Sequence, residues 1–159
     1  MKKTIALISF TMITAITSFY LYMDFSESDE LLNCNSRVII NTTNKTLKVN
    51  LTFLFPKEKK ATGIVTLNGT VYNNDAREIP IYRQVHFNYA IHNKGVVEFI
   101  STQVNLLNGD IADNDTIKDL LPKFYLETKQ TITFEIYKSS PNGLLFSRGK
   151  NALFYCWEK

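Results

Sequence analysis

The chain has 159 residues, of which 45% are hydrophobic and 13% aromatic, enough apolar material for the core of one ordinary domain. Its formal net charge is +3, and the basic residues are spread along the chain instead of forming a nucleic-acid-binding stripe. We therefore expect no nucleic acid among its partners.

The N-terminal segment is predicted to be a membrane anchor at residues 1–23. Lys2 and Lys3 precede a run of twenty uncharged residues. At about 1.5 Å per residue, a helix of this length spans about 30 Å, the thickness of a bilayer core. A cleaved signal peptide is the alternative, but its apolar region is usually about 7–15 residues long and ends at a small-x-small site. The bulky, aromatic end of this run favours an uncleaved anchor.

The charges on either side of the anchor predict its orientation. Two lysines precede it, and four acidic residues follow it within residues 24–33, a polar stretch that we expect to be a linker. The positive-inside tendency leaves the N-terminus in the cytoplasm and places a domain at residues 34–159 in the periplasm of a bacterium. The cytoplasmic part, about three residues, is too short to have a function of its own.

The sequence contains two cysteines, Cys34 and Cys156. An even number of cysteines in an exported domain predicts a disulfide bond. This bond would place the first and last strands side by side. A redox role needs a close pair such as C-x-x-C, which the sequence lacks. A bridge between two chains is the alternative.

After the linker, apolar and polar residues alternate with period two, which is typical of half-buried strands. Strands are predicted at residues 47–55, 62–72, 79–91, 96–107, 130–137, 144–147 and 152–157. Gly63 and Gly69 are predicted bend or bulge points in the second of these.

One short helix is predicted between residues 107 and 130. Asp113 or Asp115 would cap its N-terminus, apolar residues follow at helical spacing, and Pro122 would end its regular part. Asp110 joins these two carboxylates in an acidic cluster. A calcium loop needs more oxygen ligands at set spacing, so capping is the preferred interpretation.

The elements together predict a mainly β domain with seven or eight antiparallel strands and one short helix. Long strands, short turns and paired chain ends are typical of a closed or nearly closed antiparallel barrel, of which a lipocalin-like barrel is one form, or of a sandwich.

No motif of a known catalytic site is present, so we expect no enzyme and no cofactor. His86 and His92 lie six residues apart on one predicted strand, about 20 Å at about 3.3 Å per residue, which is too far for one metal ion. No metal site is therefore predicted.

Arg83 occupies a position where the alternation of its strand calls for a core residue. It would pair with a carboxylate inside a barrel, face an anionic ligand, or be turned outward by a bulge. A core filled by side chains is the alternative to a ligand cavity. The residues that would line such a cavity are Tyr82, Arg83, Phe87, Tyr89, Phe99 and Phe134.

Several features, in this order along nearly the whole chain, resemble the FidL-like proteins of enteric bacteria, small inner-membrane proteins. They are the N-terminal anchor, Cys34, the Gly63-x-x-x-x-x-Gly69 strand, YRQVHFNY at residues 82–89, LPKFY at 121–125, GLLF at 143–146 and FYC at 154–156.

This resemblance implies a protein partner. Members of that family are typically encoded beside a membrane-anchored transcription regulator with a winged-helix cytoplasmic domain, an arrangement similar to the pairing of ToxR with ToxS. In such pairs the small protein binds and stabilises the regulator's periplasmic domain. We therefore expect a periplasmic accessory protein in which an exposed strand edge could join the partner's sheet. The alternative is a periplasmic binder of a small apolar or anionic, bile-salt-like ligand.

Overall fold

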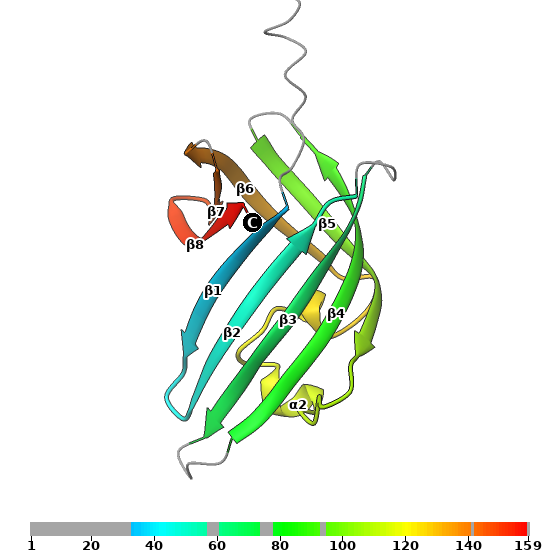
Figure 1. Cartoon of the computed structure of the whole chain (residues 1–159), viewed down its shortest axis with the longest axis vertical. Coiled ribbons are helices and arrows are strands. Elements are labelled where there is room, and N and C mark those ends of the chain that lie inside the picture. The colour runs from blue at the N-terminus through cyan, green and yellow to red at the C-terminus, as the bar shows by residue number, and fades with distance from the viewer. Residues whose placement is uncertain (1–32, 57–60, 74–77, 93–94, 141, 159) are drawn as a thin grey trace, which may run out of the picture. The chain divides into compact units, whose positions relative to one another are not determined.

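A computed structural model describes residues 33–56, 61–73, 78–92, 95–140 and 142–158 of the chain. Within these ranges, eight antiparallel strands close a barrel in which sequence neighbours pair and the last strand returns to the first (Figure 1). The strands are β1 (Cys34–Asn41), β2 (Lys45–Leu54), β3 (Thr62–Asn73), β4 (Glu78–Ile91), β5 (Val96–Leu106), β6 (Thr131–Ser140), β7 (Gly143–Arg148) and β8 (Asn151–Glu158). A barrel is therefore confirmed over a sandwich.

The predicted anchor at residues 1–23 and the linker up to residue 32 lie outside the described residues. Among those that are described, no helix has the length and apolar character needed to cross a membrane. β1 is the strand whose bounds the alternation did not predict, and the other seven strands agree with their predicted ranges to within a few residues.

Period-two alternation explains how the barrel wall is built. In β2 the side chains of Leu47, Val49, Leu51 and Phe53 point inward and are almost fully buried, while the residues between them face out. Residues that pair across neighbouring strands direct their side chains to the same face of the wall, so the inward-facing residues of adjacent strands lie side by side. The core of the domain is therefore the interior of the barrel.

The predicted bulge at Gly63 or Gly69 is wrong, because pairing passes both glycines without a shift of register. Gly69 is instead a point of close approach. A Cβ atom there would lie 2.2 Å from the backbone oxygen of Lys48 and 2.8 Å from the Cα atom of Val49, so a larger residue would push β2 and β3 apart. The pairing of β4 with β5 does shift register, between His86 and Phe87.

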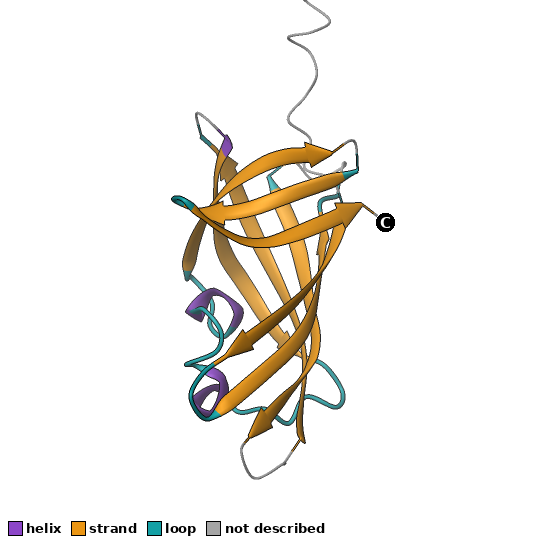
Figure 2. Ribbon diagram, turned by 90° about the vertical axis from the view of Figure 1, so that its left-hand side faces the viewer, coloured by secondary structure: helices purple, strands orange, loops and turns teal. Residues whose placement is uncertain are grey.

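The barrel wall differs between its two ends. β6 pairs with β5 only along residues 96–100 in the described part of the chain, and the three last strands lie toward one end (Figure 2). Toward the other end, beside β5, runs the segment 107–130 with α2 (Asn114–Ile117) and the 3₁₀ turn η2 (Lys123–Tyr125). Ser101 of β5 exchanges backbone hydrogen bonds with Lys129 and Gln130, which fixes where this segment ends.

The predicted helix is present but shorter than its apolar spacing indicated. Asp113 caps α2, and its carboxylate accepts a hydrogen bond from the backbone N–H of Thr116. Hydrogen bonds from Thr116 hold the pKa of this carboxyl below its usual value. Pro122 ends the regular helix, as predicted, and begins η2. Burial of Tyr125 in that turn raises the pKa of its hydroxyl well above the usual value.

The predicted disulfide bond joins Cys34 to Cys156, with Cα atoms 5.4 Å apart and a sequence separation of 122. Cys34 pairs in register with Glu158, so the bond reinforces the place where β8 meets β1. Both cysteines are buried. The bond therefore closes the barrel covalently at the junction of its first and last strands.

Replacing both cysteines (Cys34→Ala with Cys156→Ala) should lower the free energy of unfolding by about 4–5 kcal/mol, because the unfolded chain regains the entropy of a long open loop. Urea unfolding of the full chain, oxidised and reduced, measures this difference. Reduction of the native protein should give a loss similar to that of the double variant. Equal unfolding midpoints for the native and double-variant proteins would contradict the prediction.

Candidate functional site

The interior of the barrel contains an aromatic cluster that includes three of the predicted cavity-lining residues. Phe87, Phe99 and Phe134 are buried, with ring centroids 4.9 Å apart for Phe87 and Phe99 and 5.7 Å apart for Phe99 and Phe134. Phe124 of η2 also reaches this cluster, 5.9 Å from Phe87. Tyr89 packs at its margin, half-buried, 6.2 Å from Phe99. Rings in mutual contact occupy this space, as in a filled core.

Tyr82 lies on the outer face of β4, so it does not line the interior. Period two explains this position, because the neighbouring residues Ile81 and Arg83 are fully buried and point the other way. The Tyr82 hydroxyl accepts a hydrogen bond from the side-chain amide of Asn68 on β3.

Arg83 points into the barrel and is fully buried. Its guanidinium donates from Nε to Asp110 Oδ2 at 3.0 Å and from Nη1 to Asn114 Oδ1 at 2.6 Å. Nη2 donates to the backbone oxygen of Ala112. All three partners belong to the segment 107–130. The ion pair inside the barrel is therefore the correct one of the three interpretations of Arg83.

The Asp110 carboxylate, like the Arg83 guanidinium, has a hydrogen-bond partner for each of its polar atoms. Besides Arg83, its carboxylate accepts hydrogen bonds from the backbone N–H groups of Tyr82 and Ala112, both at 3.0 Å. Asn114 in turn donates to the backbone oxygen of Leu126. A buried charge is tolerable when it is paired and its remaining atoms are hydrogen-bonded, so this network can exist inside the barrel.

The other polar residues considered from the sequence do not form a common site. Asp115 contacts Lys118 on the surface, and His92 lies 3.5 Å from Glu98. His86 contacts Gln84. Among the described residues, no group of three or more His, Cys, Asp or Glu side chains is placed to hold a metal ion.

The barrel wall has a seam where β1 meets β8. In the described structure, β8 pairs with β1 only at Cys34 and Asn35, although β1 continues to Asn41. The inward-facing Val38 and Ile40 are only half-buried, whereas Leu47 and Val49, their partners on β2, are nearly inaccessible. The edge of β1 beyond Asn35, together with Trp157 of β8, is called here the β1–β8 seam.

Backbone hydrogen bonds show which groups of β1 face the seam. The N–H of Thr42 donates to the backbone oxygen of Lys45, across the turn into β2. Alternate residues of a strand direct their N–H and C=O groups to the same side, so Ile40 and Val38 also face β2. The backbone groups of Arg37, Ile39 and Asn41 therefore point toward the seam. No backbone hydrogen bond from these three groups to a described residue occurs on that side.

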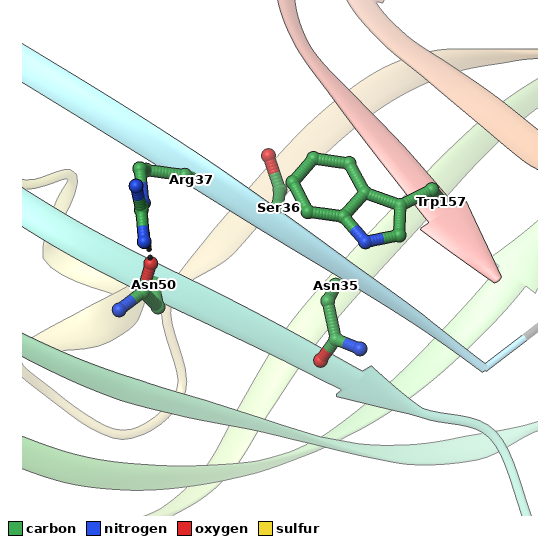
Figure 3. Close-up of a pocket in the computed structure, with 5 residues that line it drawn as sticks. All are labelled: Asn35, Ser36, Arg37, Asn50 and Trp157. Carbon is green, nitrogen blue, oxygen red and sulfur yellow. Dashed lines mark hydrogen bonds between the residues drawn. The ribbon is translucent and has the colours of Figure 1, made fainter. Parts of the chain in front are cut away.

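An open pocket of about 570 Å³ lies at the seam, lined by Asn35, Ser36, Arg37, Asn50 and Trp157 (Figure 3). The Ser36 hydroxyl is buried and has no hydrogen-bond partner in the described part of the chain. Arg37 is exposed and donates from Nε to Asn50 Oδ1, with no carboxylate beside it among the described residues. Trp157 is 47% exposed, is paired with Asn35 across β1 and β8, and lines the same pocket (Figure 3).

An apolar outer face adjoins the seam. Tyr137, Leu145 and Tyr155 form a row across β6, β7 and β8 by their pairing. Leu153 and Trp157 share the outer side of β8 with Tyr155 because the three positions alternate. Four of these five side chains are strongly exposed, and Leu145 is half-buried. We call Tyr137, Leu145, Leu153, Tyr155 and Trp157 the apolar outer face.

Reasoning from the sequence did not single out the seam residues. One available signal was the alternation in 34–41, where Ser36 falls in phase with the inward-facing Cys34 and Val38. A hydroxyl at an inward position is unusual enough to mark a candidate site. Trp157 could have been noticed as the sole tryptophan in the sequence, next to a predicted disulfide.

Comparison with known proteins gives two matches. The sequence model of a family described as the YqeJ C-terminal domain matches residues 31–156. The Escherichia coli (strain K12) protein named "Uncharacterized protein YqeJ" is 25% identical over 146 residues, covering 89% of this chain and 90% of its own length. The family match covers β1 to β7 in full and β8 as far as Cys156.

Arg83→Met should lower the free energy of unfolding by about 3–5 kcal/mol, because it leaves the Asp110 carboxylate buried and unpaired. Adding Asp110→Asn should recover part of this loss, with a coupling energy of about 1–3 kcal/mol between the two sites. Urea unfolding of the four proteins of this cycle measures the coupling. The exposed Arg37→Met serves as control, with an expected change within about 0.5 kcal/mol. Additive effects of the Arg83 and Asp110 changes would contradict the prediction.

Proposed function

The chain belongs to the YqeJ C-terminal domain family, and from this premise we propose that it is a membrane-anchored periplasmic accessory protein. In this proposal it binds a membrane-bound transcription regulator with a winged-helix cytoplasmic domain, and it stabilises or modulates that regulator. The contact is made between the periplasmic parts of the two proteins.

The observation that carries the proposal is the apolar outer face. Monomeric soluble proteins rarely expose large contiguous apolar patches, and those that occur often mark sites of protein–protein contact. Here Tyr137, Tyr155 and Trp157 bring aromatic rings to one side of three neighbouring strands. Tyrosine and tryptophan are enriched at the centres of protein interfaces.

The arrangement of the sequence supports the periplasmic location. The apolar run within residues 1–23, with lysines before it and acidic residues after it, favours a single inner-membrane anchor with its N-terminus in the cytoplasm. A disulfide bond between Cys34 and Cys156 favours an oxidising compartment. An accessory protein of this kind would act on transcription through another membrane protein.

The assignment to FidL-like proteins, and the analogy with ToxS, also belong to this proposal. They rest on the ordered motifs of the sequence, including residues 82–89 and 121–125. The barrel is compatible with a lipocalin-like partner of a regulator, but a fold alone does not determine function.

The alternative function, binding of a small apolar or anionic ligand inside the barrel, rests on the aromatic interior. Phe87, Phe99 and Phe134 would contribute apolar surface to such a site. Their rings contact one another, and the Arg83 guanidinium is engaged with Asp110, so neither is offered freely to a ligand. We therefore favour the accessory function.

We expect the full-length protein, purified from membranes in mild detergent, to co-purify with the membrane-anchored winged-helix regulator encoded beside it. Leu153→Glu should reduce the recovered regulator about tenfold or more, because it places a charge in the apolar outer face. Immunoblotting of regulator and bait measures this ratio. Deletion of the protein should also shorten the lifetime of the regulator in cells.

Ile100→Glu provides the matched control. Ile100 is 41% exposed, close to the 46% of Leu153, but it lies on β5 between Asn88 and Thr131, away from the apolar outer face. This variant should retain the regulator. An unchanged level and activity of the regulator after deletion, with no co-purification, would refute the proposed function.

A further inference from the structure

The edge of β1 at the seam has the features of a site that accepts another strand. The N–H and C=O groups of Arg37, Ile39 and Asn41 point outward, as the turn at Thr42 indicates, and they repeat at the spacing of a strand ladder. Unpaired groups of this kind are a template for β-strand addition. Asn35 and Trp157 end the native pairing and set the limit of the free edge.

A second observation indicates that something binds beside this edge. Ser36 is 2% exposed and its hydroxyl has no hydrogen-bond partner among the described residues, although it lines the pocket at the seam. Burying a hydroxyl without a partner is costly, and buried polar side chains are rarely left in this state. A group that enters the pocket could supply the missing hydrogen bond.

The charges at the seam indicate the chemistry of the occupant. Arg37 donates from Nε to Asn50, and its terminal amino groups have no carboxylate partner among the described residues, so they could bind a carboxylate of the occupant. Lys48, paired with Ile39 across β1 and β2, extends over Tyr72 on β3 instead, so among the residues lining the pocket the positive charge is that of Arg37. Two copies of this chain, paired through β1, would each bring Arg37 to the shared edge, and neither β1 strand contains a carboxylate to pair with it.

We propose that the β1 edge from Arg37 to Asn41 binds an extended, acidic segment of a partner polypeptide as an added strand. The segment pairs with the backbone of Ile39, a carboxylate of the segment contacts Arg37, and a polar group of it reaches Ser36. Trp157 packs over the end of the added strand. The inference deepens the proposed function, since the partner named there would supply the segment, but its test does not depend on that partner.

Trp157 provides a direct readout, because it is the sole tryptophan of the chain and lines the pocket. The probe is a soluble nine-residue peptide of alternating threonine and glutamate with blocked ends. The control peptide has lysine in place of glutamate. The full-length protein in detergent micelles is titrated with each peptide while the emission of Trp157 is recorded. The glutamate peptide should give a saturable change, and the lysine peptide should give none.

Two substitutions at one position separate backbone pairing from side-chain contact. Ile39→Pro removes an N–H that points to the seam and is not used in pairing with β2, so the barrel should tolerate it as edge strands tolerate proline. It should weaken binding of the glutamate peptide about tenfold or more, whereas Ile39→Ala, which keeps the N–H, should bind within about twofold of the native protein. Unfolding curves of both variants verify that the barrel is intact.

Charge reversal at Arg37 tests the proposed chemistry. Arg37→Glu should abolish the preference for the glutamate peptide and create binding of the lysine peptide. Equal binding of both peptides to the native protein, or native-like binding by Ile39→Pro, would overturn the inference. A protein that dimerises through β1 and ignores both peptides would also overturn it, because the occupant would then be a second copy.

The peptide test of the edge site and the co-purification test of the proposed function can fail independently of each other. Peptide binding that depends on Ile39 and Arg37, without co-purification of the regulator, would support the edge site and refute the accessory function. Co-purification of the regulator, without binding of the glutamate peptide to the native protein, would support the accessory function and refute the edge site.

Discussion

The ion pair between Arg83 and Asp110 is the interaction on which the rest of the barrel depends. β6, β7 and β8 pair around one end, and the segment 107–130 lies beside β5 toward the other. That segment has only short stretches of helix to hold its shape. Arg83 fixes it by binding Asp110, Ala112 and Asn114 together. The apolar side chains of the segment, such as Phe124, are thereby held against the aromatic cluster. A buried charge has no water to replace a lost partner, so removal of either member of the pair is destabilising.

The alternation of apolar and polar residues predicted the strands, whereas the choice between a barrel and a sandwich depended on pairing between residues far apart in the sequence. Alternation in residues 47–55 and 79–91 is a property of each strand alone, so it could be predicted from neighbouring residues. The same holds for the Asp113 cap and for Pro122. The choice between a barrel and a sandwich depends on whether β8 reaches β1, more than a hundred residues away in sequence. The cysteine pair was the sequence feature that spanned this distance, and it predicted the junction correctly.

The candidate site was harder to predict because it arises where β1 and β8 pair over only two residues. Ser36 and Trp157 lie where β1 and β8 part after two paired residues, which neither strand's own sequence reveals. Tyr82 shows the opposite error. Its aromatic ring suggested a cavity, but its phase between Ile81 and Arg83 already placed it outside. Arg83 was recognised as unusual from its phase. Its partner, Asp110, is one of three carboxylates close together in the sequence, and nothing in the sequence showed which of the three would pair with Arg83.

The Cys34–Cys156 bond also determines how the domain would respond to mechanical tension. Cys34 is the first residue of β1, and any pull from the N-terminal side reaches the barrel there. Without the bond, tension could peel β1 from its two-residue contact with β8, one hydrogen bond at a time. With it, the load passes through a covalent link into β8 and from there into β7. The domain would thus behave under load as a rigid body on a tether, and the seam would keep its shape while its attachment point is pulled.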